Sequence, residues 1–161
     1  FYGQLETLLR PVIHESFSRR IMGKYANKEY IFSLPKEQQA IILSQINQFD
    51  DVLFRTLTST YGKGLLAFDG QRIEVIESGK SKSKALVKQL IYGDRQTPYM
   101  VIFAIKKDDY GFWKIGNFMF ENIDFGRIYK KQFISLLKFY NGDVDLVIKN
   151  WSLSRVDIEN P

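Results

Sequence analysis

The spacing of hydrophobic positions changes twice along this chain. In the first part of the chain they recur every three or four residues, in the middle every second residue, and towards the end every three or four again. The longer spacing is typical of amphipathic helices and the shorter one of strands. The pattern therefore predicts helices, then strands, then helices.

Helices are predicted for Tyr2 to Tyr25 and for a longer segment opened by Pro35. We expect the first to break near Pro11, because proline lacks a backbone donor. Proline suits the first turn of the second, where that donor would be unpaired anyway. One face of the long helix is expected to be buried, through Ile42, Ile46, Phe49, Leu53, Leu57 and Tyr61.

Four strands are predicted in the middle of the chain, at 72–77, 85–92, 99–107 and 112–121. Short polar or glycine-containing turns separate them, which favours an antiparallel meander. We predict an α+β fold with helices packed on one face of a curved four-stranded antiparallel sheet. This is an NTF2-like cone enclosing an apolar cavity.

Two aspartates are predicted to cap the final helices. Asp124 precedes a stripe that begins at Phe125, and Asp143 precedes a short helix that ends near Trp151. A carboxylate at such a position accepts the unpaired N–H groups of the first turn. We predict one domain over 1–151 and a polar tail over 152–161.

The third and fourth strands are apolar on both faces. Val101 and Phe103 share one face of the third strand, while Met100 and Ile102 share the other. An antiparallel sheet with one solvated face would show polar residues there, so the second face must also be covered. A filled core explains this pattern, and so does an elongated apolar pocket between sheet and helices.

Composition adds an excess of aromatic residues and a mild positive charge. Aromatics make up 15% of the chain, Cys is absent and the net charge is +5. Lysines cluster at 80–88, 106–107 and 130–131, which is typical of a solvated surface and lacks the density of a nucleic-acid footprint. No apolar run approaches the roughly 18 residues of a membrane span.

Reactive chemistry is sparse. His14 is the only histidine, and we expect it at the surface or in a capping role. The pairs Asp50-Asp51 and Asp108-Asp109 are adjacent in sequence, and no phosphate loop, metal-ligand cluster or nucleophile motif occurs. The chain is therefore predicted not to be an enzyme. Two alternatives stay open, a cone-fold enzyme using Asn117 or Glu121 on a small apolar substrate, and a protein-interaction module.

Three segments of the chain follow a pattern that is typical of one protein family. The first is Met22-Gly23-Lys24-Tyr25 before a proline-opened helix. The other two match through Tyr61, Leu65, Leu66, Phe68, Gly70 and Gln71, and through Trp113, Lys114, Glu121, Ile123, Phe125, Tyr129, Gln132 and Phe133. In their order and spacing these segments resemble the MlaC, or toluene-tolerance, family of phospholipid-binding proteins. The chain departs from the family pattern with Asn117 for Asp, Asn122 for Gly and Lys130 for Arg. Asparagine tolerates left-handed backbone, so we expect the joint at Asn122 to be retained.

The resemblance implies a monomeric carrier in the periplasm of a Gram-negative envelope. Family members shuttle phospholipid between an outer-membrane lipoprotein complex (MlaA-like) and an inner-membrane ABC transporter with its MlaD-like ring, which maintains outer-membrane lipid asymmetry. No cofactor, metal or nucleic acid is expected, and phospholipid is the cargo. The pocket is predicted to be lined by Tyr61, Leu65, Tyr99, Val101, Phe103, Phe118, Met119, Phe120, Ile123, Phe125, Tyr129 and Phe133.

Overall fold

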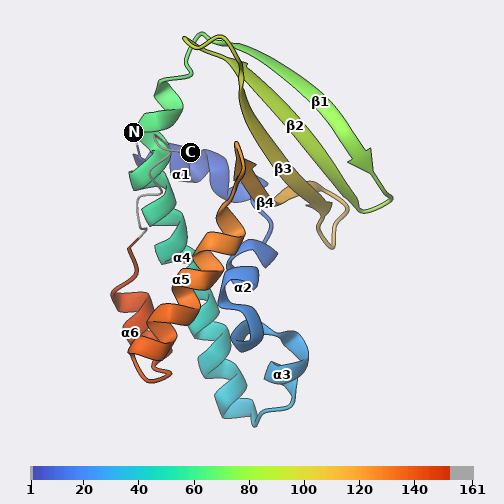
Figure 1. Ribbon diagram of the computed structural model, residues 1–161. Helices are drawn as coiled ribbons and strands as arrows, with labels where there is room; N and C mark the ends of the chain where they lie inside the picture. Colours follow the sequence, from blue (N-terminus) through green and yellow to red (C-terminus); the bar gives the residue numbers. More distant parts are fainter. Residues whose placement is uncertain (1, 153–161) are drawn as a thin grey trace.

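The computed structural model describes residues 2–152 and, within them, every side chain except those of Tyr2, Lys63, Leu65, Glu77 and Ser78. The predicted tail at 152–161 lies, apart from Ser152, outside the described residues. Helices come first, then strands, then helices, as predicted (Figure 1). The first group comprises α1 (Tyr2–Leu9), η1 (Arg10–Val12), α2 (Ser16–Met22), η2 (Gly23–Ala26), α3 (Lys28–Phe32) and α4 (Lys36–Leu66).

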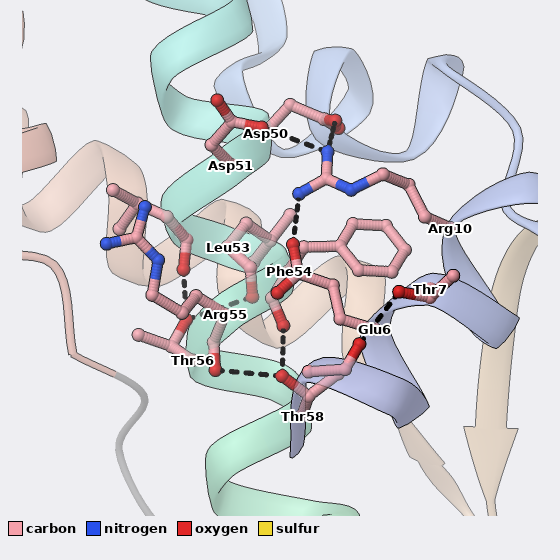
Figure 2. A network of polar contacts seen from close by, with 12 residues as sticks. Glu6, Thr7, Arg10, Asp50, Asp51, Leu53, Phe54, Arg55, Thr56 and Thr58 are labelled. Carbon is pink, nitrogen blue, oxygen red and sulfur yellow. Dashed lines mark hydrogen bonds and ion pairs between the residues drawn. The ribbon is translucent and has the colours of Figure 1, made fainter. Parts of the chain in front are cut away.

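The N-terminal helix breaks where Pro11 predicts it. Pro11 lies in the short 3-10 turn η1, between α1 and α2. The preceding residue, Arg10, then holds α1 against α4. Figure 2 shows its guanidinium between Glu6 at 2.6 Å and two aspartates of α4, Asp50 at 3.3 Å and Asp51 at 2.9 Å. These groups are partly exposed, so each ion pair alone contributes little to stability. The network mainly fixes the orientation of α1 against α4.

Helix α4 carries the core of the helical layer. Its residues Ile42, Ile46, Phe49 and Leu53 are buried, as their spacing predicts. They pack with Phe17 and Ile21 of α2 and with residues from two later helices, α5 (Phe125–Phe139) and α6 (Val144–Lys149). Asp124 and Asp143 cap α5 and α6 as predicted, accepting hydrogen bonds from Arg127 N and Leu146 N, each at 3.0 Å.

The strands form one antiparallel meander in the order β1-β2-β3-β4-β5. This confirms the α+β class and the antiparallel pairing, but the predicted count of four strands is wrong. The strands are β1 (Arg72–Lys80), β2 (Lys84–Tyr92), β3 (Tyr99–Lys107), β4 (Trp113–Phe120) and β5 (Ile123–Asp124). The fifth is only two residues long and pairs Ile123 with Phe120 and Asp124 with Met119.

The turn into β5 depends on Glu121 rather than on Asn122. Glu121 has φ 54°, and Asn122 is not among the non-glycine residues with positive φ in the described chain. Contacts of both the backbone and the side chain of Glu121 hold this strained conformation. Glu121 N donates to Met100 O at 2.7 Å, while its carboxylate pairs with Arg95 and accepts from Met100 N at 3.2 Å. The chain can therefore fold back on β4 without a glycine.

The helices meet the sheet mainly at β4, which α2, η1 and α5 all contact. β1 and β2 extend to the side of the helices (Figure 1). The junction is fixed by Asn117, which is 4% exposed. Its Nδ2 donates to Asp124 Oδ1 at 2.9 Å and its Oδ1 accepts from Gly126 N at 3.0 Å, so one buried amide joins β4 to the start of α5.

Gly126→Ala tests this junction. A Cβ at Gly126 would lie 2.5 Å from Asn117 Oδ1, so the amide and the helix must separate. We expect a loss of about 1–3 kcal/mol in the free energy of unfolding, measured by urea denaturation. Gly116→Ala is the matched control, because its Cβ would lie at ordinary contact distance, 3.6 Å from Ala104 O. Equal stabilities for the two variants would contradict the assignment.

Candidate functional site

Most of the aromatic residues predicted to line a pocket come together at the junction of sheet and helices. Phe118 of β4 stacks on Phe125 of α5 with ring centroids 4.6 Å apart, and Tyr61 of α4 meets Phe125 edge-on at 5.5 Å. The Tyr129 hydroxyl lies 3.1 Å from that of Tyr61. Burial, and then the hydrogen bond to Tyr61, raise the pKa of Tyr129. The phenol is thus neutral and structural.

A second aromatic group closes the end of the sheet nearest the C-terminus of α4. Tyr99 stacks on Phe120 at 6.0 Å, and Phe68, in the turn after α4, packs edge-on against Tyr99 at 5.5 Å. Phe68 was not among the predicted lining residues. The signal available for it in the sequence was its match to the family pattern.

The strand register determines which face of β4 points towards the aromatic cluster. Phe118 pairs with Phe103, and Phe120 with Val101, so these four side chains share one face with Tyr99. Ile123 joins them through its pairing with Phe120, whereas Met119 lies on the opposite face. The three apolar residues predicted on β4 are thus divided two to one, with both phenylalanines on the face of the aromatic cluster.

This cluster is filled in the structure. Phe125, Tyr129 and Phe133 are at most 2% exposed and belong to the packed core. The Leu65 side chain lies outside the described part of the chain. None of the other predicted residues lines the larger described cavity, which lies further along the sheet.

That cavity is an open cleft of about 620 Å³ between α2 and the far ends of β2 and β3. Its floor is apolar and comes from small or aliphatic residues of three strands, Ala85, Leu86, Ala104, Ile105 and Gly116. Its rim is basic and consists of Arg20, Lys80, Lys84 and Lys106, with Ser16, Gly79 and Ser81 beside them. The volume lies within the usual range for small-molecule sites.

The charges on the rim are largely unpaired. Lys84 and Lys106 stand directly opposite each other on β2 and β3. Among the side chains that the structure describes, neither has an ion pair, and Arg20 reaches Asp124 only at 4.0 Å. Burial lowers the pKa of the Lys106 ammonium, and the charge on Lys84 lowers it further. An anion at the rim would relieve this repulsion.

One apolar residue of the cleft floor, Ile105, shares a sheet face with the predicted wall. The register of β3 and β4 shifts between Ala104 and Ile105, because Gly116 of β4 has no partner. Such a bulge adds local twist, through which residues from both faces of the sheet reach the cleft. Ile105 and Phe103 are two residues apart on β3 and share a face. Ala104 and Leu86, which pair across β2 and β3, lie on the opposite face.

A second cavity of about 250 Å³ lies between η1, α4 and the β3–β4 turn, lined in part by Arg10, His14 and Asp50.

His14 is buried, so its predicted surface position is wrong. The predicted capping role is supported, because its Nδ1 accepts a hydrogen bond from Ser16 N at 3.0 Å. Burial lowers the pKa of His14, and so does Lys106. No group of His, Cys, Asp and Glu in the described chain is arranged to hold a metal.

The residues behind the two alternative hypotheses have structural roles. Asn117 and Glu121, the candidates for a cone-fold enzyme, hold the start of α5 and the turn into β5. Phe118 and Phe120 are partly buried and Phe125 is fully buried, so they do not form an exposed docking surface. Neither alternative gains support from this geometry.

Three comparisons place the chain among known proteins. The family model described as "MlaC protein" matches residues 1–152. The toluene tolerance protein ttg2D of Pseudomonas putida is 27% identical over 155 residues, and the alignment covers 94% of this chain but 66% of that protein. A phospholipid-binding protein from Ralstonia solanacearum, solved in complex with a phospholipid, has a similar fold, with TM-score 0.58 and 18% identity over 88% of this chain and 72% of its own. None of the helices in residues 2–152 combines the length and apolar character that crossing a membrane requires.

Lys84→Gln tests the repulsion at the rim. Removing one of two like charges that face each other should raise the free energy of unfolding by a few tenths of a kcal/mol at low ionic strength. The gain should disappear in high salt, which screens exposed charges. Urea denaturation at two salt concentrations measures it, with Lys138→Gln on α5 as control. A gain independent of salt would show that the lysines do not repel each other.

Proposed function

The chain belongs to the MlaC family, and we propose that it is a phospholipid carrier. The observation that carries the proposal is the cleft, in which an apolar floor lies beneath unpaired cations. A phospholipid has the complementary chemistry, with acyl chains to cover the floor and a phosphate to meet the lysines. Each CH₂ taken out of water contributes about 0.8 kcal/mol, so a carrier needs continuous apolar lining.

In this proposal the acyl chains enter at the cleft and run along the sheet face that carries Tyr99, Val101, Phe103, Phe118 and Phe120. The helical side of the path comprises Tyr61, Leu65, Phe125, Tyr129 and Phe133. Ile123 lies near its edge, whereas Met119 points to the other side of β4. Since the described aromatic side chains pack against each other, a lipid that runs along them must separate some of them. The phosphate lies at the rim, near Lys84 and Lys106.

The partners and location follow from the same proposal. The carrier works in the periplasm as a monomer, receiving and delivering phospholipid at an outer-membrane lipoprotein complex (MlaA-like) and an inner-membrane ABC transporter with its MlaD-like ring. It thereby supports outer-membrane lipid asymmetry. It performs no catalytic step and uses no cofactor, since binding and release suffice. The chain spans 66% of the length of ttg2D, so these activities are proposed for the protein as a whole.

Ala104→Trp should close the cleft. Ala104 lines its floor, and an indole there would occupy the space that the acyl chain needs. We expect native mass spectrometry of gently purified protein to show phospholipid bound to the parent chain and at least about tenfold less bound to the variant. Ala40→Trp, at an exposed site on α4, is the size-matched control. A parent protein that contains no lipid and takes none up from liposomes would refute the carrier function.

Ile123→Trp tests the inner path separately. Ile123 pairs with Phe120 at the entrance to α5, where a larger side chain would obstruct chains running along the aromatic face. We expect reduced lipid loading and unchanged circular dichroism. If lipid content is normal here but lost in Ala104→Trp, the acyl chains are confined to the cleft and the predicted wall is not part of the site.

A further inference from the structure

The two hairpin turns beside the cleft form a surface that shares the lysines of the cleft rim and extends well beyond it. We define this surface, the hairpin tip, as residues 80–84 and 106–114. The backbone N–H of Lys107 donates to Ser83 O at 2.9 Å, which joins the end of β3 to the β1–β2 turn. Both turns lie at the same end of the sheet (Figure 1).

The β3–β4 turn is held in a defined shape by Asp108. One oxygen of its carboxylate accepts from the N–H groups of Tyr110 at 3.0 Å and Phe112 at 2.9 Å. The other pairs with Lys114 Nζ at 3.0 Å. The turn therefore displays its aromatic side chains on an ordered support.

Three aromatic residues in this turn and at the start of β4 face solvent. Tyr110 is 87% exposed, Phe112 68% and Trp113 37%. The Lys107 ammonium lies 5.3 Å from the centre of the Trp113 ring. Large exposed apolar groups gathered in one place are costly in water and typically mark a surface that is covered during function.

The hairpin tip also holds most of the excess positive charge. Its two segments contain six lysines and two aspartates, a net charge of +4, when the whole chain has +5. It contains no arginine. Protein–protein interfaces are enriched in arginine and depleted in lysine, so this composition does not fit a protein partner well. Aromatic rings flanked by lysines are typical of segments that lie at the headgroup level of a membrane.

We propose that the hairpin tip docks on the surface of an anionic phospholipid bilayer, with Tyr110, Phe112 and Trp113 inserted among the headgroups. The lysines attract the anionic surface, and the aromatic rings supply the apolar contact. Docking in this way does not require the cleft to hold lipid. If the proposed carrier function also holds, Lys80, Lys84 and Lys106 bring the mouth of the cleft to the bilayer from which lipid is taken.

Trp113 provides a direct readout. The chain has two tryptophans, and Trp151 is buried against Phe49, so Trp151→Phe leaves Trp113 as the reporter. We expect its emission to shift to the blue on mixing with vesicles of equimolar phosphatidylglycerol and phosphatidylcholine. Affinity for pure phosphatidylcholine vesicles should be at least about tenfold weaker. Raising the salt concentration should release the protein from the anionic vesicles.

Vesicle flotation of variants tests which residues form the docking surface. Phe112→Ser and the pair Lys82→Glu with Lys107→Glu should each weaken binding at least about tenfold. Phe139→Ser, which removes a 75% exposed aromatic at the end of α5, should leave it unchanged. Ala104→Trp should still bind vesicles, which separates this proposal from lipid loading. No binding, equal binding to neutral vesicles, or binding without a change in Trp113 emission would overturn it.

Discussion

One buried amide determines how the two layers of this protein meet. Asn117 lies on β4, where its amide donates to the capping aspartate and accepts from the N–H of Gly126 in the first turn of α5. Unpaired buried polar groups are costly, so the three partners hold each other in place. The stacking of Phe118 on Phe125 and the contact of α2 with β4 follow from this position. The neighbouring strands are then free to extend beyond the helices.

Charge is distributed unequally over the resulting shape. On the helical side Arg10 is surrounded by Glu6, Asp50 and Asp51, so positive charge is neutralised where it only joins helices. At the hairpin end, by contrast, Lys84 faces Lys106 without a described counterion. Such an arrangement lowers stability slightly, and it is the kind of local cost expected where a protein binds something of opposite charge.

The features that sequence predicts well here are local ones. The alternation of apolar residues identifies four strands, and Pro11, Asp124 and Asp143 mark helix ends correctly, because each effect acts within one turn of chain. The fifth strand was missed since it requires positive φ at Glu121, which only the contacts with Arg95 and Met100 explain. The cleft was missed for a similar reason. Its lysines are distant in sequence and meet only through strand register, and apolar periodicity cannot distinguish a filled core from a cavity.

The extension of β1 and β2 beyond the helices implies that the molecule is not uniformly stable. β1 has a single neighbouring strand, and its Ile73, Val75 and Ile76 are exposed, whereas β4 lies between two strands and under three helical segments. Local opening costs least where few groups are buried, so the outer hairpin can fluctuate while the junction at β4 stays closed. Gly79 and Lys80 of that hairpin belong to the cleft. The cleft can therefore widen by motion of its outer edge alone, without disturbing the core.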